Sequence, residues 1–214
     1  AAYVKSVLAE VGNRDWTASK AAIAQAPKNC FPELKAALTG LVAREEASER
    51  ALKAVLKTKI GQKIGVVADK AYSGKLERIA NGVLHISRPF LINGKIKGYG
   101  THRVSIAELT PKTRQTLAPV MPPASPEDWI QEILGMLANG MLAPAKASLE
   151  RVTGNVLEKP MRGFVEEAVT EDREQRARTA WSALVSQAGT QLSERKAGEL
   201  LKAFDAFEKE FGTT

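Results

Sequence analysis

The spacing of apolar residues changes near Lys59, and this change constrains the fold more than any other feature of the sequence. Over residues 3–57 the chain is rich in alanine, and its apolar side chains recur at the spacing of helix turns. Breaks near Gly12, Pro27 and Pro32 divide this stretch. We therefore predict three helices before Lys59.

After Lys59 the sequence consists of short β-branched runs separated by glycines. These runs are KIGVV, KLERI, GVLHIS, FLI, KIKGY and HRVSI. Asn81-Gly82 and Asn93-Gly94 are typical of tight hairpin turns, in which both central residues adopt positive φ. About five or six short strands of this kind predict a small SH3-like antiparallel barrel, with essentially all β-structure between residues 60 and 107.

Helix-start signals return after the β-rich stretch. Thr110 is a candidate N-cap, and Pro111 follows it in the first helical turn. Ser125 and Asp128 have the spacing of a capping box, with Pro126 between them. We predict helix over most of residues 127–211.

Together these patterns predict an α+β protein that is mainly helical, with the small SH3-like antiparallel β-barrel inserted into it. We expect three parts: an N-terminal helical unit (1–58), a basic barrel module (59–114) and a C-terminal helical unit (115–214). The middle part carries 11 Lys and Arg against 3 Asp and Glu, a net charge of +8. The last part carries 11 against 15, a net charge of −4, so the basic excess belongs to the barrel module.

The three tryptophans each lie among alanine and leucine at helical spacing. Such stripes face the core of a helical protein. We therefore predict that Trp16, Trp129 and Trp181 are core residues rather than ligand-stacking residues.

The two helical regions resemble each other. At a constant offset of 126, Asn13, Trp16, Lys20-Ala21 and Ile23 match Asn139, Leu142, Lys146-Ala147 and Leu149. This match predicts two copies of one helical unit. The segments NRDWTASKAAI and NGMLAPAKASL each resemble the second helix of a tetratricopeptide hairpin. That resemblance implies a helical-repeat interaction domain.

A second resemblance lies at the end of the β-rich stretch. VSIAELTPKTRQTL is similar to the last strand and following turn of SLA1-type, SH3-like modules. The likeness implies a binding module rather than an enzyme.

The residues that carry chemistry are few and scattered. Two histidines and one cysteine, Cys30, offer no thiol-based metal site, and no histidine lies near Cys30 to act as a base. Neighbouring acids such as Glu45-Glu46 and Glu166-Glu167 point apart on a helix. We predict no catalytic residue, no metal and no cofactor, and we expect both His85 and His102 on the surface.

The stretch from Gly82 to Ile106 is basic and contains no acidic residue. If Ile96 points inward, strand alternation places Lys95, Lys97 and Tyr99 together on the outside. The candidate binding residues on this basic face are Arg88, Lys95, Lys97, Tyr99, His102 and Arg103.

Two uses of this basic face stay open. Cations beside an aromatic ring are typical of surfaces that bind single-stranded nucleic acid. The same face would also suit solvent, or docking against acids of the C-terminal helices such as Glu166, Glu171 and Asp172.

The sequence therefore predicts a non-catalytic binding or scaffolding region that contacts a protein or peptide through its helical units and barrel. The alternative is a nucleic-acid or other polyanion-binding module that uses the basic face. No apolar run approaches the length of a membrane span, so we expect no membrane insertion. The chain starts AAYVKS, with neither an initiator methionine nor a signal sequence, and we expect it to be a piece of a larger protein.

Overall fold

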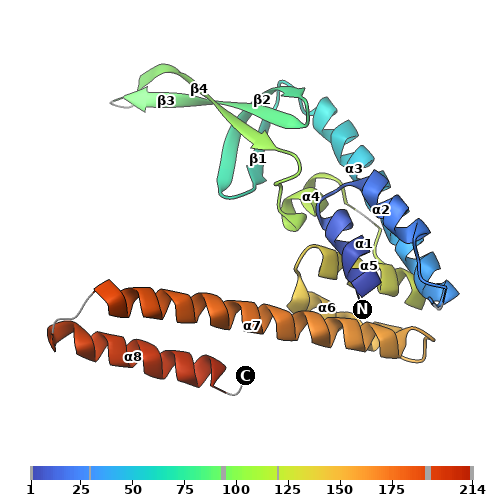
Figure 1. Ribbon diagram of the computed structural model, residues 1–214. Helices are drawn as coiled ribbons and strands as arrows, with labels where there is room; N and C mark the ends of the chain where they lie inside the picture. Colours follow the sequence, from blue (N-terminus) through green and yellow to red (C-terminus); the bar gives the residue numbers. More distant parts are fainter. Residues whose placement is uncertain (1, 29, 93–94, 120, 191–193, 213–214) are drawn as a thin grey trace.

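The computed structural model describes residues 2–28, 30–92, 95–119, 121–190 and 194–212. It confirms the α+β class and the three helices before Lys59 (Figure 1). These helices are α1 (Ala2–Gly12), α2 (Trp16–Ala24) and α3 (Pro32–Thr58). Strands occur between residues 63 and 105, as the change in periodicity predicted.

The β-rich stretch forms one antiparallel sheet with the strand order β1-β2-β3-β4. Its strands are β1 (Lys63–Val67), β2 (Ala71–Ala80), β3 (Val83–Ile92) and β4 (Lys95–Ser105). Among the described residues β1 and β4 do not pair, so the sheet is open, in contrast to the closed barrel that we predicted.

The prediction of five or six strands is wrong because two pairs of predicted strands are continuous. GVLHIS and FLI both belong to β3, and KIKGY and HRVSI both belong to β4. Beyond Ser87, β3 pairs with β4 and no longer with β2. Pro89 therefore lies on a two-stranded ribbon, where its missing N–H is tolerated.

The turn from β2 to β3 has the predicted geometry. Asn81 has φ 49° and Gly82 has φ 73°, the left-handed values that a tight hairpin turn requires. The second predicted turn, Asn93-Gly94, lies outside the described residues.

Six helical segments follow the sheet in the described residues, and the first two of them begin where the capping signals predicted. They are α4 (Pro111–Leu117), α5 (Pro126–Ala138), α6 (Leu142–Ser148), the 3₁₀ helix η1 (Leu149–Val152), α7 (Glu158–Thr190) and α8 (Glu194–Phe211). The Thr110 hydroxyl accepts a hydrogen bond from Thr113 N at 3.3 Å. Ser125 and Asp128 form the reciprocal capping box, with bonds of 3.1 and 3.0 Å.

Apolar side chains form two separate cores. The first contains residues of α1, α2, α3, α5, α6, η1 and α7, so the N-terminal and C-terminal helices share it. The second lies between the sheet and the end of α3, where Leu52 and Leu56 pack with Leu76, Leu84 and Ile86. The 27-residue helix α3 enters both cores and thereby fixes the sheet to the helical body.

The helix bounds agree with an internal repeat. Helix α2 begins at Trp16 and α6 at Leu142, while α3 begins at Pro32 and α7 at Glu158. Both pairs of starts differ by the offset of 126 that the sequence match gave. The helix order α1–α3 is thus matched by α5–α7, which is consistent with the predicted repeat.

Backbone geometry repeats as well. Arg14 and Gly140, which differ by the same offset, both have positive φ, of 60° and 68°. Helices α1 and α5 end 126 residues apart, at Gly12 and Ala138, and pack against each other. At their contact, a Cβ added to Gly12 would lie 2.5 Å from the carbonyl oxygen of its counterpart, Ala138.

Gly12→Ala is therefore expected to lower the free energy of unfolding by about 1–3 kcal/mol, because the two helices would have to separate. Gly163→Ala in α7 is the matched control, since nothing lies within 4 Å of the added Cβ there. The control is expected to stabilise the helix by about 0.5–1 kcal/mol. Urea unfolding followed by circular dichroism measures both, and equal effects would contradict the close contact.

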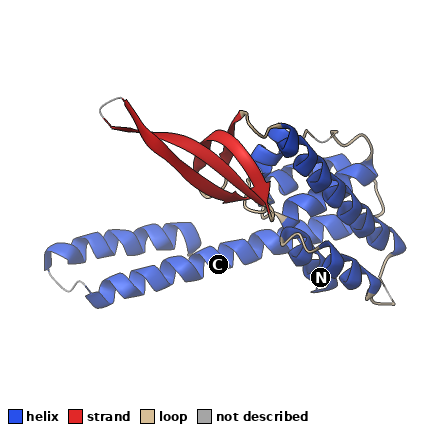
Figure 2. Cartoon of the chain, turned by 90° about the horizontal axis from the view of Figure 1, so that it is seen from above, coloured by secondary structure: helices blue, strands red, loops and turns tan. Residues whose placement is uncertain are grey.

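The tryptophan prediction holds for two of the three residues. Trp16 and Trp129 are half-buried and pack against the first core. Trp181 is 49% exposed, so its assignment to the core is wrong. Trp181 lies on α7 and packs against α8, with its ring centroid 5.9 Å from that of Phe204 and 5.6 Å from that of Phe207. That helical hairpin extends away from the helical body (Figures 1 and 2).

Candidate functional site

The most prominent feature of the sheet is a two-stranded arm, which we define as residues 88–92 and 95–100. It extends past the point where β2 stops pairing and stands away from the helices (Figures 1 and 2). Phe90, Ile96 and Tyr99 on this arm are 53%, 55% and 68% exposed. Exposed apolar groups concentrated on a thin ribbon are typical of contact surfaces.

The strand register distributes the candidate residues over both faces of the ribbon. Arg88 alternates with the buried Leu84 and Ile86, whereas Tyr99 and Arg103 lie on the opposite face. A register shift between Phe90 and Leu91 leaves Lys97 without a paired residue and returns Lys95 to the face of Arg88. The predicted grouping of Lys95, Lys97 and Tyr99 is wrong, because one extra residue reverses strand alternation.

The two histidines also lie on opposite faces. His102 pairs with Ile86, on the core side, and its ring meets Tyr72 edge to face at 5.6 Å. His85 is 9% exposed, which corrects its prediction as a surface residue. It lies in an inner strand between Arg78 and Arg103, whose long side chains flank it on the same face.

The cations of the candidate face are unpaired within the described part of the chain. There, Arg88, Lys95, Lys97 and Arg103 make no ion pair and no side-chain hydrogen bond.

The acids considered as internal partners have other contacts. Glu171 pairs with Lys5, and Asp172 pairs with Arg176 at 2.9 Å. Glu166 also forms no ion pair with a candidate cation among the described residues. The described structure therefore shows exposure of the basic residues rather than docking against the helices.

The register reveals further basic residues that sequence reasoning missed. The face of the sheet opposite the second core presents Lys63, Lys75, Arg78, Tyr99 and Arg103, all of them exposed. We call these five residues the outer face. Cross-strand pairing brings together residues far apart in the sequence, and the net charge of the middle segment was the one available indication of this cluster.

Like charges are direct neighbours on this outer face. Lys63 lies opposite Lys75, and Arg78 and Arg103 flank His85 from both sides. Glu77 is the nearest acid along β2, at the shift in register next to Arg78. Cross-strand pairs of like charge destabilise a sheet.

Lys75→Glu is therefore expected to raise the free energy of unfolding, by about 0.2–1 kcal/mol, because it places opposite charges across from each other. Lys75→Gln is the matched control and is expected to give a smaller rise. Thermal unfolding at low salt measures both variants. A stability loss in Lys75→Glu would show that Lys75 has a structural partner.

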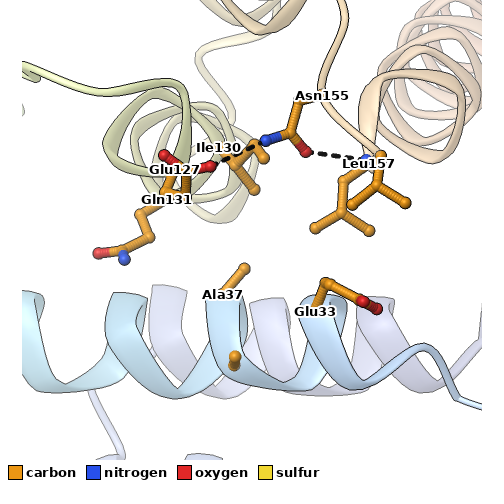
Figure 3. A pocket seen from close by; sticks show the side chains of 9 residues that line it. Glu33, Ala37, Glu127, Ile130, Gln131, Asn155 and Leu157 are labelled. Carbon is orange, nitrogen blue, oxygen red and sulfur yellow. Dashed lines mark hydrogen bonds between the residues drawn. The ribbon is translucent and has the colours of Figure 1, made fainter.

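The helical body contains a shallow cavity of about 270 Å³ between α3, α5 and the loop before α7 (Figure 3). Ala37, Ile130 and Leu157 give it apolar walls. The side-chain amide of Asn155, on the cavity wall, makes two hydrogen bonds. Its Nδ2 donates to Glu127 Oε1 at 3.1 Å, and its Oδ1 accepts from Leu157 N at 2.9 Å (Figure 3). These bonds hold the loop before α7.

A second cavity of about 310 Å³ lies between α1, α5 and α7. Lys5 lies on its wall and forms an ion pair with Glu167 at 2.8 Å, which raises the pKa of Lys5 through the hydrogen bond. The lining residues Val4 and Lys5 of this cavity and Ile130 and Gln131 of the first cavity are also 126 residues apart. Both are grooves between packed helices.

One half-buried cation has a structural role at the junction of sheet and helices. Burial lowers the pKa of Arg114 in α4 to about 10, so the guanidinium stays charged at neutral pH. It donates to the carbonyl oxygens of Leu109, at 3.0 Å, and Ile106. These bonds tie α4 to the end of β4.

Within the described residues no three His, Cys, Asp or Glu side chains lie close enough to hold a metal ion. Cys30 is half-buried and is not in a disulfide. In the same part of the chain, no helix has both the length and the apolar character that a membrane crossing requires. No protein-family model, curated protein or solved structure matches the chain.

Proposed function

We propose that this chain is a non-catalytic binding and scaffolding region of a larger protein, in which the helical body presents the basic sheet and its arm to an acidic partner. The observation that carries the proposal is the set of exposed, unpaired cations on β3 and β4. Arg88, Lys95, Lys97 and Arg103 lack ion pairs within the described chain, while the exposed apolar groups of the arm lie among them.

The scaffold supports this role physically. Helix α3 contributes to both cores, so the sheet is fixed to the body at one end while the arm stays free. Electrostatic attraction would orient an approaching acidic partner toward the free end. The likeness to tetratricopeptide hairpins and SH3-like modules agrees with a binding role and is part of the proposal.

A direct test compares two variants with the same change in net charge. In the first, the cations Arg88, Lys95, Lys97 and Arg103 are all replaced by glutamine. In the control, the exposed cations Lys28, Lys35, Lys146 and Lys159 of the helical body are replaced by glutamine. Affinity for heparin and for poly-glutamate is measured between about 50 and 200 mM salt.

We expect the wild type and the control to bind at least one of these polyanions with affinity that falls steeply as salt rises. The first variant is expected to lose most of this affinity while its circular dichroism spectrum stays unchanged. Equal losses in both variants would mean that net charge alone attracts the probe, and the proposal would be wrong. Absence of binding by the wild type would also overturn it.

A further inference from the structure

Besides its charge, the outer face has an exposed aromatic ring that lies beside hydroxyl-bearing residues. Tyr99 is 68% exposed, and the next residue along β4 on the same face is Thr101. Thr101 pairs with Ser87, which pairs with Lys75. On the outer side of the sheet, Tyr99 is thus followed by the hydroxyl-bearing Thr101 and Ser87 and then by the cation Lys75.

We propose that the outer face binds single-stranded nucleic acid, with phosphates on Lys63, Lys75, Arg78 and Arg103 and a base stacked on Tyr99. This inference rests on the proposed function and names the class of its acidic partner. It differs from the candidate face of the sequence analysis, since Arg88 and Lys95 lie on the other side of the ribbon.

The cations are placed to follow a phosphate backbone. Lys63 and Lys75 are on adjacent strands, about 5 Å apart at their backbones. Arg78 and Arg103 are two strands apart, about 10 Å, with His85 between them. Long, flexible side chains at these spacings reach successive phosphates of a strand that crosses the sheet.

The exposed tyrosine favours nucleic acid over an acidic peptide. A base offers a flat π-face to an aromatic side chain, whereas aspartate and glutamate side chains do not. A sheet with an exposed ring and surrounding cations is also a known platform for single strands. Duplex nucleic acid keeps its bases stacked inside the helix, so Tyr99 could not reach a base face there.

The unfavourable placement of like charges on the outer face also indicates a function. Like charges opposite each other destabilise the sheet, and the described chain supplies no ion pair that compensates Lys63, Lys75, Arg78 or Arg103. Places where a sequence departs from local stability rules are often binding sites. A phosphate backbone would provide the missing negative charge.

The test is a titration of the whole chain with a fluorescent oligothymidine, repeated at several salt concentrations between about 50 and 200 mM. For four phosphate contacts, log affinity is expected to fall against log salt with a slope of about −3. Arg78→Gln with Arg103→Gln is expected to flatten the slope by about 1.4. Circular dichroism and the unfolding midpoint confirm that each variant is folded.

The matched control is Lys35→Gln with Lys146→Gln, which removes the same charge from exposed positions of the helical body. Its slope is expected to equal that of the wild type. Tyr99→Leu is expected to weaken oligothymidine binding about five- to a hundredfold at unchanged slope, because it removes stacking and no cation.

Each other outcome contradicts one part of the proposal. Equal flattening by both double variants would exclude the outer face as the site. Poly-glutamate that binds as tightly as an oligothymidine of equal charge, with no effect of Tyr99→Leu on either probe, would overturn the nucleic-acid assignment and leave the proposed function standing. Absence of binding to both probes would overturn the proposed function as well.

Discussion

Leu38→Ala is expected to lower the free energy of unfolding by about 2–5 kcal/mol. Leu38 is fully buried in α3, within the core that the N-terminal and C-terminal helices share. Truncation removes apolar contacts and leaves a cavity between helices that other helices hold in place. Urea unfolding followed by circular dichroism measures the loss.

Lys35→Ala is the control for this prediction, because Lys35 is exposed one turn earlier on the same helix. It is expected to change the free energy of unfolding by less than about 0.5 kcal/mol. A loss below about 1 kcal/mol in Leu38→Ala would show that the two helical regions do not form one packed core.

Leu56→Ala tests the second core in the same way. Leu56 is fully buried where α3 meets the sheet, and its truncation is expected to cost about 2–5 kcal/mol of the stability of that core. Hydrogen exchange should then accelerate at the amides of β2 and β3, since local opening has its own free energy. The amides of α1 and α5 should keep their wild-type protection.

The control is Lys57→Ala, which alters an exposed neighbour in the same helix turn. It is expected to leave exchange in the sheet unchanged. If Leu56→Ala accelerated exchange equally in α1, α5 and the sheet, the two cores would be one cooperative unit rather than two that open separately.

Features that depend on nearby residues could be predicted from the sequence. Thr110, Ser125 and Asp128 cap their helices through bonds spanning three or four residues, so the sequence contains both partners within one turn. The turn at Asn81-Gly82 could likewise be predicted, because the two residues that adopt positive φ are adjacent in the sequence. Most of the similar residues at an offset of 126 also fall on α2 and α6, which begin at the same offset, as do α3 and α7.

Features that depend on pairing between strands could not be predicted in the same way. GVLHIS and FLI were predicted as separate strands, but Pro89 between them is tolerated within β3 because β2 no longer pairs with β3 beyond Ser87. The shift in register near Lys97 is equally invisible in a single strand. For this reason the predicted basic face was wrong about which side chains lie together.

The exposure of Trp181 could not be predicted from the sequence either. Its apolar stripe correctly indicated a packed helix, and it does pack against Phe204 and Phe207. Spacing along one helix does not reveal how many helices cover that stripe. Helix α8 covers one side, and 49% of Trp181 stays exposed.

The basic sheet, rather than the helical body, is the surface that we propose for contact with the acidic partner. The most direct measurement is a titration of the isotope-labelled chain with oligothymidine, followed through the backbone amide signals of each residue. We expect the largest signal changes at Lys75, Arg78, Tyr99 and Arg103, with α5 and α7 unaffected. Changes confined to the grooves between helices, or no changes in the sheet at saturating oligothymidine, would contradict the proposal.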